Sequence, residues 1–361
     1  MVDPVAPLES LDRSGKTTSL ASPGTAPLLV VLGPTAAGKS ALGLALAECL
    51  NGEIVNCDSV QIYRGFDVGA GKVPLEERRG IPHHLLDLVE PNQLFTAGDY
   101  RREATRAIES IREGGRVPVL VGGTGLYLRA LLSGLFEGPP RSESLRARLK
   151  TLANRQSRRS NKGGDPFPGE AAGRGAEPAK SEVLHRLLRR LDPATAARIH
   201  PCDTQKLVRA IEVCLLARQP MSGMLERGRA GLTGYAVIKI GLSPDRAQLY
   251  ERINRRVEGM FAAGLMEETR RLLARGDASS LKPLEALGYR QAAAAVGGGI
   301  TAEEALGQAQ AATRRYAKRQ MTWFRRETEV TWFVGFGDDS EIQQQIFNWL
   351  RSQRGFKHAS A

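Results

Sequence analysis

A phosphate-binding loop is predicted by eight residues with the spacing G-x-x-x-x-G-K-[ST], namely Gly33-Pro34-Thr35-Ala36-Ala37-Gly38-Lys39-Ser40. The two glycines let the backbone curl so that successive N–H groups point at an anion. Lys39 adds a positive charge for the terminal phosphates, and the Ser40 hydroxyl is expected to bind Mg²⁺. Such loops most often serve nucleotide hydrolysis or phosphoryl transfer, so a kinase is the default interpretation of the loop alone.

The residues around this loop predict a parallel sheet with helices between its strands. Apolar runs that read as strands occupy residues 28–32, 53–57, 117–121, 236–242 and 330–334. Ligands bind at the carboxyl ends of such strands, so Asp58 and Thr124 are expected beside the loop. A strand-end Asp commonly holds a metal ion or activates a nucleophile. The alternatives are a helix N-cap for Asp58 and a turn hydroxyl for Thr124.

The expected fold class is α/β, a P-loop NTPase-like parallel sheet flanked by helices, with an inserted helical domain. The predicted divisions are a disordered tail (1–25), a core in two pieces (26–140 and 236–340), an inserted helical domain (141–235), and a C-terminal helix and tail (341–361). Helices in the inserted domain are predicted at 144–154, 181–191, 193–199 and 204–217. Residues 155–180, dense in Gly, Pro, Arg, Lys and Ser, predict a flexible insertion.

Charge and cysteine usage indicate the partners and the compartment. The chain has 361 residues and a net charge of +12, which favours a polyanionic partner such as nucleic acid, with a merely solvated basic surface as the alternative. Its four cysteines have no metal-binding spacing and predict reduced thiols in a cytoplasmic protein. No apolar run reaches about 18 residues, so no membrane span is expected. We also expect a monomer.

Two adjacent histidines, His83 and His84, suggest a metal site at first sight. Neighbouring residues rarely face one site, and no Cys or Glu is spaced to complete a ligand set. A hydrogen-bonding role for both rings is therefore the better interpretation.

Several motifs together resemble those of the tRNA dimethylallyltransferases (isopentenyl-tRNA transferases) of the bacterial type. Besides the loop, they are residues 58–63, 81–87, 122–127, 198–210, 252–257, 287–291 and 316–325, which span about 28–333 in the family's order. The departures are few. Ala70 stands where the family usually has Thr, residues 155–180 exceed the usual length, and the C-terminal zinc finger of many eukaryotic members is absent.

The resemblance implies transfer of a dimethylallyl group from dimethylallyl diphosphate to N6 of the adenosine that follows the anticodon in tRNA. Asp58 is then expected to accept the amine proton, and Thr124 to orient the amine or base. The loop holds the diphosphate leaving group with Mg²⁺. The expected diphosphate contacts are Gly33, Thr35, Ala36, Ala37, Gly38, Lys39, Ser40 and Arg256, with Arg252 as a further candidate.

The same resemblance implies contacts to a base flipped out of the anticodon loop. The residues expected to bind tRNA are Asp58, Ser59, Val60, Gln61, Thr124, Arg146, Gln205, Lys206, Leu207, Val208 and Arg209. Residues 314–326 interleave aromatic and basic side chains, which suits RNA, although a solvated basic face is the alternative. Three other functions stay open: an adenylate isopentenyltransferase acting on free AMP, ADP or ATP, a small-molecule kinase, and a non-catalytic RNA-binding protein.

Overall fold

A computed structural model describes residues 25–136, 138–160, 182–226, 231–275 and 282–353 of the chain. These residues form two compact units, of which the first ends at Leu132 and resumes at Leu232, and the second lies between. Residues 1–24 of the predicted tail (1–25) and residues 161–180 of the predicted insertion (155–180) lie outside the described residues.

The boundaries of the helical unit differ from the predicted ones at 141 and 235. The unit starts earlier, at Ser133, because the residues before 141 are bonded to its helices. The guanidinium of Arg209, for example, donates to the carbonyl of Pro139 at 3.2 Å. The first unit resumes at Leu232, whose amide donates to the carbonyl of Leu131 at 3.1 Å.

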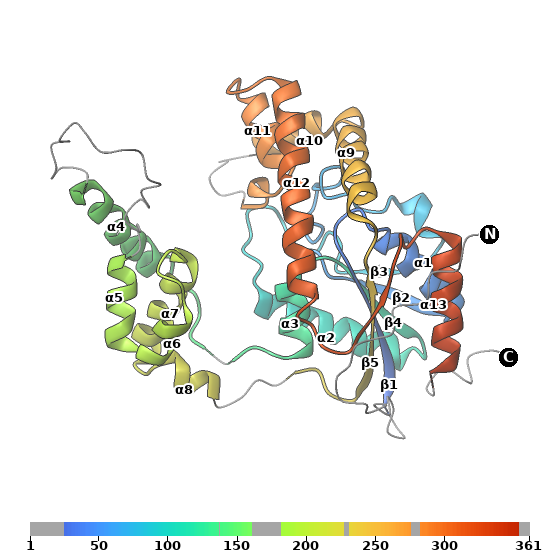
Figure 1. Cartoon of the computed structure of the whole chain (residues 1–361), viewed down its shortest axis with the longest axis horizontal. Coiled ribbons are helices and arrows are strands. Elements are labelled where there is room, and N and C mark those ends of the chain that lie inside the picture. Colours follow the sequence, from blue (N-terminus) through green and yellow to red (C-terminus); the bar gives the residue numbers. More distant parts are fainter. Residues whose placement is uncertain (1–24, 137, 161–181, 227–230, 276–281, 354–361) are drawn as a thin grey trace, which may run out of the picture. The chain divides into compact units, whose positions relative to one another are not determined.

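A sheet of six strands organises the first unit, in the order β3-β2-β4-β1-β5-β6 (Figure 1). Its strands are β1 (Ala26–Leu32), β2 (Gly52–Asn56), β3 (His83–His84), β4 (Val117–Val121), β5 (Tyr235–Leu242) and β6 (Val330–Phe333). Every pair is parallel, and β1 lies between β4 and β5. The predicted parallel sheet is confirmed. Only β3 carries no strand pattern in the sequence, because it has two residues.

Side chains of β1 alternate between two cores because successive residues of a strand point to opposite faces of its sheet. Leu29 and Val31 pack with α1 (Lys39–Cys49) and α13 (Ser340–Ser352), whereas Leu28, Val30 and Leu32 pack with α2 (Ala97–Glu113) and α3 (Gly125–Leu132). Figure 1 shows these helix pairs on the two sides of the sheet. A strand that is apolar on both faces is therefore explained by helices covering both faces.

Four further helices lie at the carboxyl ends of the central strands. They are α9 (Arg246–Ala262), α10 (Leu265–Ala274), α11 (Tyr289–Val296) and α12 (Ala302–Phe324), with the 3₁₀ turn Lys282–Glu285 before α11. Ala36 of the phosphate loop packs against Ile253 of α9 and Ala317 of α12, which brings these helices to the loop. The sequence predicts helices at 245–263, 265–274 and 301 to about 325, which agree with α9, α10 and α12 within one residue, and it predicts no helix at the short α11. A second 3₁₀ turn, Leu75–Arg78, lies between β2 and β3.

The second unit is helical, as predicted from its apolar periodicity. Its helices are α4 (Glu143–Ser160), α5 (Glu182–Leu191), α6 (Pro193–Arg198), α7 (Thr204–Ala217) and α8 (Met221–Glu226). Leu149, Leu184, Leu188 and Ile211 meet in its core. The helix α4 continues six residues past its predicted end at Asn154. None of the helices in the described part of the chain is long and apolar enough to cross a membrane.

Candidate active site

The loop between β1 and α1 has the shape of an anion cradle. Ala36 and Gly38 adopt left-handed backbone angles, with φ values of 64° and 81°, and the Ala37 amide donates to the Pro34 carbonyl at 3.3 Å. Glycine is required at Gly38, because φ is 81° and a Cβ there would lie 2.7 Å from the backbone nitrogen of Gly337. The first turn of α1 leaves its amides without intrahelical acceptors and carries the positive end of the helix dipole. An anion of phosphate type fits this position.

Lys39 is a cation held in a largely desolvated place. Its Nζ donates to the Pro34 carbonyl at 2.7 Å. Burial, helped by repulsion from Arg256 and opposed by Asp58, lowers the pKa of Lys39 from 10.5 to about 7. A bound dianion would favour the charged ammonium and reverse this shift. A diphosphate bound in the loop would therefore stabilise the charged form of Lys39.

Asp58 reaches the same cleft from the end of β2. Its Oδ1 accepts hydrogen bonds from the amides of Val60 at 2.8 Å and Gln61 at 3.4 Å, so one oxygen caps the turn that follows. No described residue donates to Oδ2. A carboxylate has lone pairs on both oxygens, so capping by Oδ1 leaves Oδ2 available to accept a proton.

Thr124 performs a different task from Asp58. Its hydroxyl oxygen accepts the Ser59 amide at 3.0 Å, and its carbonyl accepts the amides of Tyr127 and Leu128 in the first turn of α3. The cleft wall at this point is made by Gly122 and Gly123. Thr124 therefore ties the β4 loop to the segment that follows Asp58, which is the turn-hydroxyl role weighed as its alternative.

Two cavities meet at these residues. The larger, of about 1020 Å³, contains the phosphate loop and is lined by Lys39, Ser40 and Arg252. The smaller, of about 420 Å³, has an apolar wall that includes Ile253, Val257, Met260, Leu265 and Leu287. Residues that line both cavities are Thr35, Ala36, Asp58, Ala70, Arg256 and Tyr316. An anion in the loop and an apolar group beside it can both lie next to Asp58.

The two predicted arginines of α9 have unlike surroundings. Arg252 makes a bidentate ion pair with Asp338, at 2.8 and 2.6 Å, and stacks on Phe336 with 4.7 Å between the guanidinium carbon and the ring centroid. Arg256 projects into the cleft beside Gly71, where a Cβ would lie 2.1 Å from its Nη2. Enclosure by the cleft walls lowers the pKa of Arg256, and Asp58 opposes that shift. Arg256 is therefore the guanidinium more available to a diphosphate.

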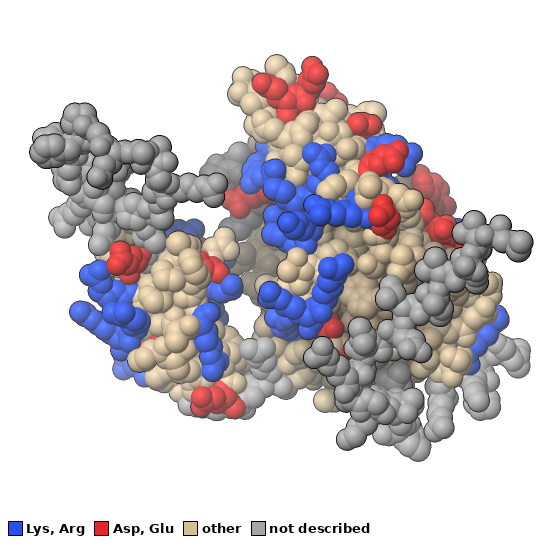
Figure 2. All heavy atoms as spheres, viewed as in Figure 1, with Lys and Arg blue, Asp and Glu red and all other residues tan. Residues whose placement is uncertain are grey.

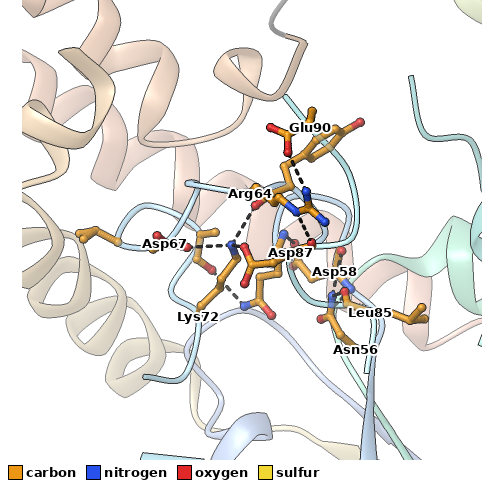
Figure 3. A network of polar contacts seen from close by, with 12 residues as sticks. Asn56, Asp58, Arg64, Asp67, Lys72, Leu85, Asp87 and Glu90 are labelled. Carbon is orange, nitrogen blue, oxygen red and sulfur yellow. Dashed lines mark hydrogen bonds and ion pairs between the residues drawn. The ribbon is translucent and has the colours of Figure 1, made fainter. Parts of the chain in front are cut away.

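The segment between β2 and β3 is held by polar contacts at the sheet edge (Figure 3). Lys72, with a buried ammonium, donates to Asp67 at 2.8 Å, to Asp87 at 2.6 Å and to the Tyr63 carbonyl at 2.8 Å. Gln61 donates to the carbonyls of residues 70 and 71 at 3.1 and 3.3 Å. Gln61, which is predicted to contact tRNA, therefore also holds the cleft wall beside Arg256 in place.

Three residues of the site receive no role from the sequence: Glu268 lies outside the motifs, and Tyr289 and Gln320 lie inside the motifs at 287–291 and 316–325. Glu268 of α10 accepts the amides of residues 67, 68 and 69 at 3.2, 2.8 and 3.2 Å, and Tyr289 donates to its carboxylate at 2.5 Å. Gln320 of α12 bonds to the phosphate loop and to Gly123. A weak signal exists, because Glu268 and Gln320 stand on the apolar faces of their helices, next to Leu272 and Phe324 at i+4.

The predicted tRNA contacts in the helical unit need correction. Leu207 and Val208 are buried, at 0% and 3% exposure, because they face the core of this unit, so their side chains cannot touch RNA. Arg146 and Arg209 each donate to the buried carboxylate of Glu212, at 2.7–2.8 Å. Burial raises the pKa of Glu212, but these bonds outweigh it and lower that pKa to about 2.

Two of the predicted residues on α7 stay accessible. Gln205 and Lys206 are exposed, and the Lys206 ammonium lies 2.6 Å from the carboxylate of Asp203. In the first unit, Ser59, Val60 and Gln61 are half-buried beside Asp58.

Basic side chains gather over α12, as Figure 2 shows. The exposed cations of this face are Arg315, Lys318, Arg319, Arg325 and Arg326. The guanidinium carbon of Arg129 lies 4.7 Å from the ring centroid of Trp323, and that of Arg319 lies 5.7 Å from the ring centroid of Tyr316. The aromatic rings are partly buried and the charges face solvent. Such a face attracts a phosphate backbone.

The paired histidines make hydrogen bonds, as the sequence reading favours. His83 Nδ1 lies 2.9 Å from the Ile81 carbonyl, and His84 Nε2 lies 2.5 Å from the Glu53 carboxylate. Within the described residues, no cluster of three or more His, Cys, Asp or Glu could hold a metal ion.

The residues at the loop nevertheless fit Mg²⁺ bound together with a diphosphate. This ion usually keeps several waters and takes few protein ligands beside phosphate oxygens. The Ser40 hydroxyl is exposed on the cleft wall, where it can supply such a ligand.

Comparison with known proteins agrees with this geometry. The chain is 50% identical to a tRNA dimethylallyltransferase of Solibacter usitatus over 88% of this chain and 96% of that one. For the enzyme of the same name from Koribacter versatilis, the identity is 51% over 90% and 98%. A crystal structure of the full-length tRNA isopentenylpyrophosphate transferase from Bacillus halodurans superposes with a TM-score of 0.62, at 36% identity, over 92% of this chain and 99% of that one.

A eukaryotic dimethylallyltransferase acting on tRNA shares the fold, with a TM-score of 0.66 at 22% identity, over 92% of this chain and 77% of that one. The family described as IPP transferase matches residues 61–327, which run from the segment after β2, through the helical unit, to just past the end of α12. By this match and by the identity to its curated relatives along nearly the whole chain, the protein belongs to the IPP transferase family.

Proposed function

We propose that this protein transfers a dimethylallyl group from dimethylallyl diphosphate to N6 of the adenosine 3′ to the anticodon, position 37, of tRNA. The observation that carries the proposal is the position of Asp58 where the two cavities meet. Its carboxylate lies beside a cationic phosphate loop and beside a cavity that has one apolar wall and charged residues such as Arg290 and Glu285 elsewhere in its lining. A prenyl diphosphate has the same division into an anionic and an apolar part.

The reaction forms a bond between N6 and C1 of the prenyl group and breaks the bond from C1 to the diphosphate oxygen. The electron pair of the broken bond leaves with the diphosphate, whose charge Lys39, Arg256 and the loop amides stabilise. Adenine N6 is a weak nucleophile because its lone pair is delocalised into the ring. Asp58 Oδ2 is available to accept the N6 proton as the new bond forms, and it then releases that proton to water.

An RNA substrate is favoured by the charge of the protein. The net charge is +12, and exposed cations on α12 and just after it gather on the unit that holds the cleft (Figure 2). A free mononucleotide has no use for such a face. The similar bacterial proteins are also named as tRNA enzymes.

The test is incubation with labelled dimethylallyl diphosphate and either total tRNA or AMP, with a third reaction that contains γ-labelled ATP. We expect label in tRNA alone, and binding that weakens with salt at a log–log slope of roughly −0.7 per phosphate contacted in a single strand. Salt-insensitive labelling of AMP would identify an adenylate isopentenyltransferase. Transfer from ATP to a small molecule would identify a kinase.

Three further properties belong to this proposal. Mg²⁺ supplies charge neutralisation of the diphosphate, with Ser40 as its protein ligand, so chelation should abolish turnover and added Mg²⁺ should restore it. The protein acts in the cytoplasm, in keeping with the four cysteines, none of which is paired in a disulfide. It acts as a monomer, which its mass in solution tests.

A further inference from the structure

We propose that Gln320 is a positioning residue for prenyl transfer: it fixes the phosphate loop relative to the loop that supports Asp58. This inference rests on the proposed function. Gln320 lies near the end of α12, and its side chain is buried, with 6% exposed. Its Oε1 accepts the amide of Thr35 at 2.8 Å, and its Nε2 donates to the carbonyl of Gly123 at 2.9 Å.

The chemistry of the two partners determines the orientation of this amide. A backbone N–H can only donate and a carbonyl can only accept, so Oε1 must face Thr35 and Nε2 must face Gly123. Neither a carboxylate nor an apolar side chain can make both bonds. The fit is also tight, because a Cβ on Gly123 would lie 2.3 Å from Nε2. Glycine at this position lets the two loops share one side chain.

The Gly123 loop is in turn bonded to the segment that carries Asp58. The Thr124 amide donates to the Cys57 carbonyl at 3.1 Å, and the Thr124 hydroxyl accepts the Ser59 amide at 3.0 Å. Residues 57 and 59 flank Asp58. A continuous chain of hydrogen bonds therefore runs from Thr35 of the phosphate loop, through Gln320 and Thr124, to both sides of the proposed base.

Displacement at C1 requires the departing oxygen and the attacking nitrogen on opposite sides of the same carbon. The phosphate loop places the first, and Asp58 places the second. Reacting atoms must approach to about 3–3.5 Å, and a misplacement of about 1 Å can cost on the order of 10²-fold in rate. Gln320 lines the larger cavity, but both ends of its side-chain amide are bonded to backbone groups of the two loops. It acts by keeping the distance between the two loops constant.

The test compares three variants of the full chain: Gln320→Leu, Gln320→Glu and the control Gln308→Leu. Gln308 is exposed on the same helix, so its replacement makes the same chemical change away from the site. We measure single-turnover transfer to tRNA at saturating substrates, the Kd values for dimethylallyl diphosphate and tRNA, and thermal unfolding. The leucine variant should lose about 10- to 100-fold in transfer rate, as expected for misaligned loops, while both Kd values stay within about threefold.

The glutamate variant separates the two bonds. It keeps an acceptor for Thr35 but sets a carboxylate oxygen against the carbonyl of Gly123, so it should also be slow although it retains the phosphate-loop contact. A normal rate for Gln320→Glu would show that the Gly123 bond is dispensable and would overturn the proposal. So would a leucine variant as fast as wild type, or one whose loss lies entirely in the Kd values. Failure of the wild-type protein to label tRNA would instead reject the proposed function, and this inference with it.

Discussion

Asparagine at position 58 separates the structural role of the aspartate from its chemical role. Oδ1 of Asp58 caps the turn by accepting the amides of Val60 and Gln61, at 2.8 and 3.4 Å. The amide oxygen of asparagine can accept the same two bonds, so Asp58→Asn should leave the turn intact. What it removes is the negative charge and the ability to take a proton at Oδ2.

The expected magnitude follows from that division. Loss of a general base costs about 10²–10⁴-fold in rate. Loss of the cap alone, as in Asp58→Ala, costs about 1 kcal/mol of stability and acts on folding rather than on chemistry. Both variants should therefore be slow by similar factors, and only the alanine variant should unfold at a lower temperature.

The assay is single-turnover formation of prenylated tRNA with enzyme in excess, at pH 6 and pH 8. Two pH values are needed because Asp58 raises the pKa of Lys39, so its removal leaves Lys39 less protonated near neutral pH. At pH 6 that secondary effect is reduced, and donor affinity should stay close to that of the wild type. A lower transfer rate that persists at pH 6 is caused by the loss of the proton acceptor at position 58.

Asp245→Asn is the matched control, because Asp245 Oδ1 accepts the amides of residues 247 and 248 at 2.9 and 3.0 Å in the same pattern and does not line the cleft. It should retain the transfer rate within about twofold, the range expected for a cap that survives the change. If Asp58→Asn behaves like this control, Asp58 only caps its turn, and the assigned base is wrong.

Three other predictions concern charged groups. Folding lowers the pKa of Lys39 from 10.5 to about 7, so between these pH values the folded chain binds fewer protons than the unfolded chain, and the contribution of Lys39 to stability rises with pH. Lys39→Met should therefore raise Tm more at pH 6 than at pH 9, and it should abolish donor binding. An equal rise in Tm at both pH values would contradict the desolvation argument. Glu212→Gln leaves Arg146 and Arg209 without their buried counter-ion and should lower the free energy of unfolding in denaturant by about 3–5 kcal/mol. The control Glu182→Gln, at an exposed position, should change it by almost nothing. The contribution of Glu212 to stability is complete above its ordinary pKa of 4.5 and is lost as pH falls toward 2. Glu268→Gln offers one acceptor oxygen to three amides, so the loop of residues 67–71 should loosen and KM for dimethylallyl diphosphate should rise. Tyr289→Phe, which removes one hydrogen bond to Glu268, should raise KM less. An unchanged KM in both variants would show that these hydrogen bonds do not affect donor binding.

Local patterns predicted most of the fold. The phosphate loop could be read directly, because a turn that wraps an anion requires glycines at fixed offsets and a lysine after the second one. Apolar runs predicted the long strands. The apolar period of Tyr100, Ala104, Ile108 and Ile111 predicted a helix at about 97–113, the bounds of α2, and the helix predicted at 204–217 has the bounds of α7. Three short elements, α8, α11 and β3, were not predicted, because they have few residues and no apolar run or period that marks them.

The helical unit shows where resemblance to a family motif fails as a guide to contacts. Residues 205–209 lie on one helix, and only its packing decides which of them face outward. Leu207 and Val208 turn into the core, Arg209 bonds to a buried glutamate, and Gln205 and Lys206 remain exposed. Consecutive residues of a helix point in directions about 100° apart, so a contiguous motif cannot form one contact surface.

The sequence by itself determined the anion-binding loop, the parallel sheet behind it and the strand end that carries Asp58, because each depends on residues close together in the chain. Tertiary structure alone decided which side chains hold these parts in place. Gln320 lies 285 residues from its partner Thr35, and Glu268 lies 200 residues from its partner Val68. A buried polar group must find a partner wherever the packed helices bring one, and no local spacing records which partner that is.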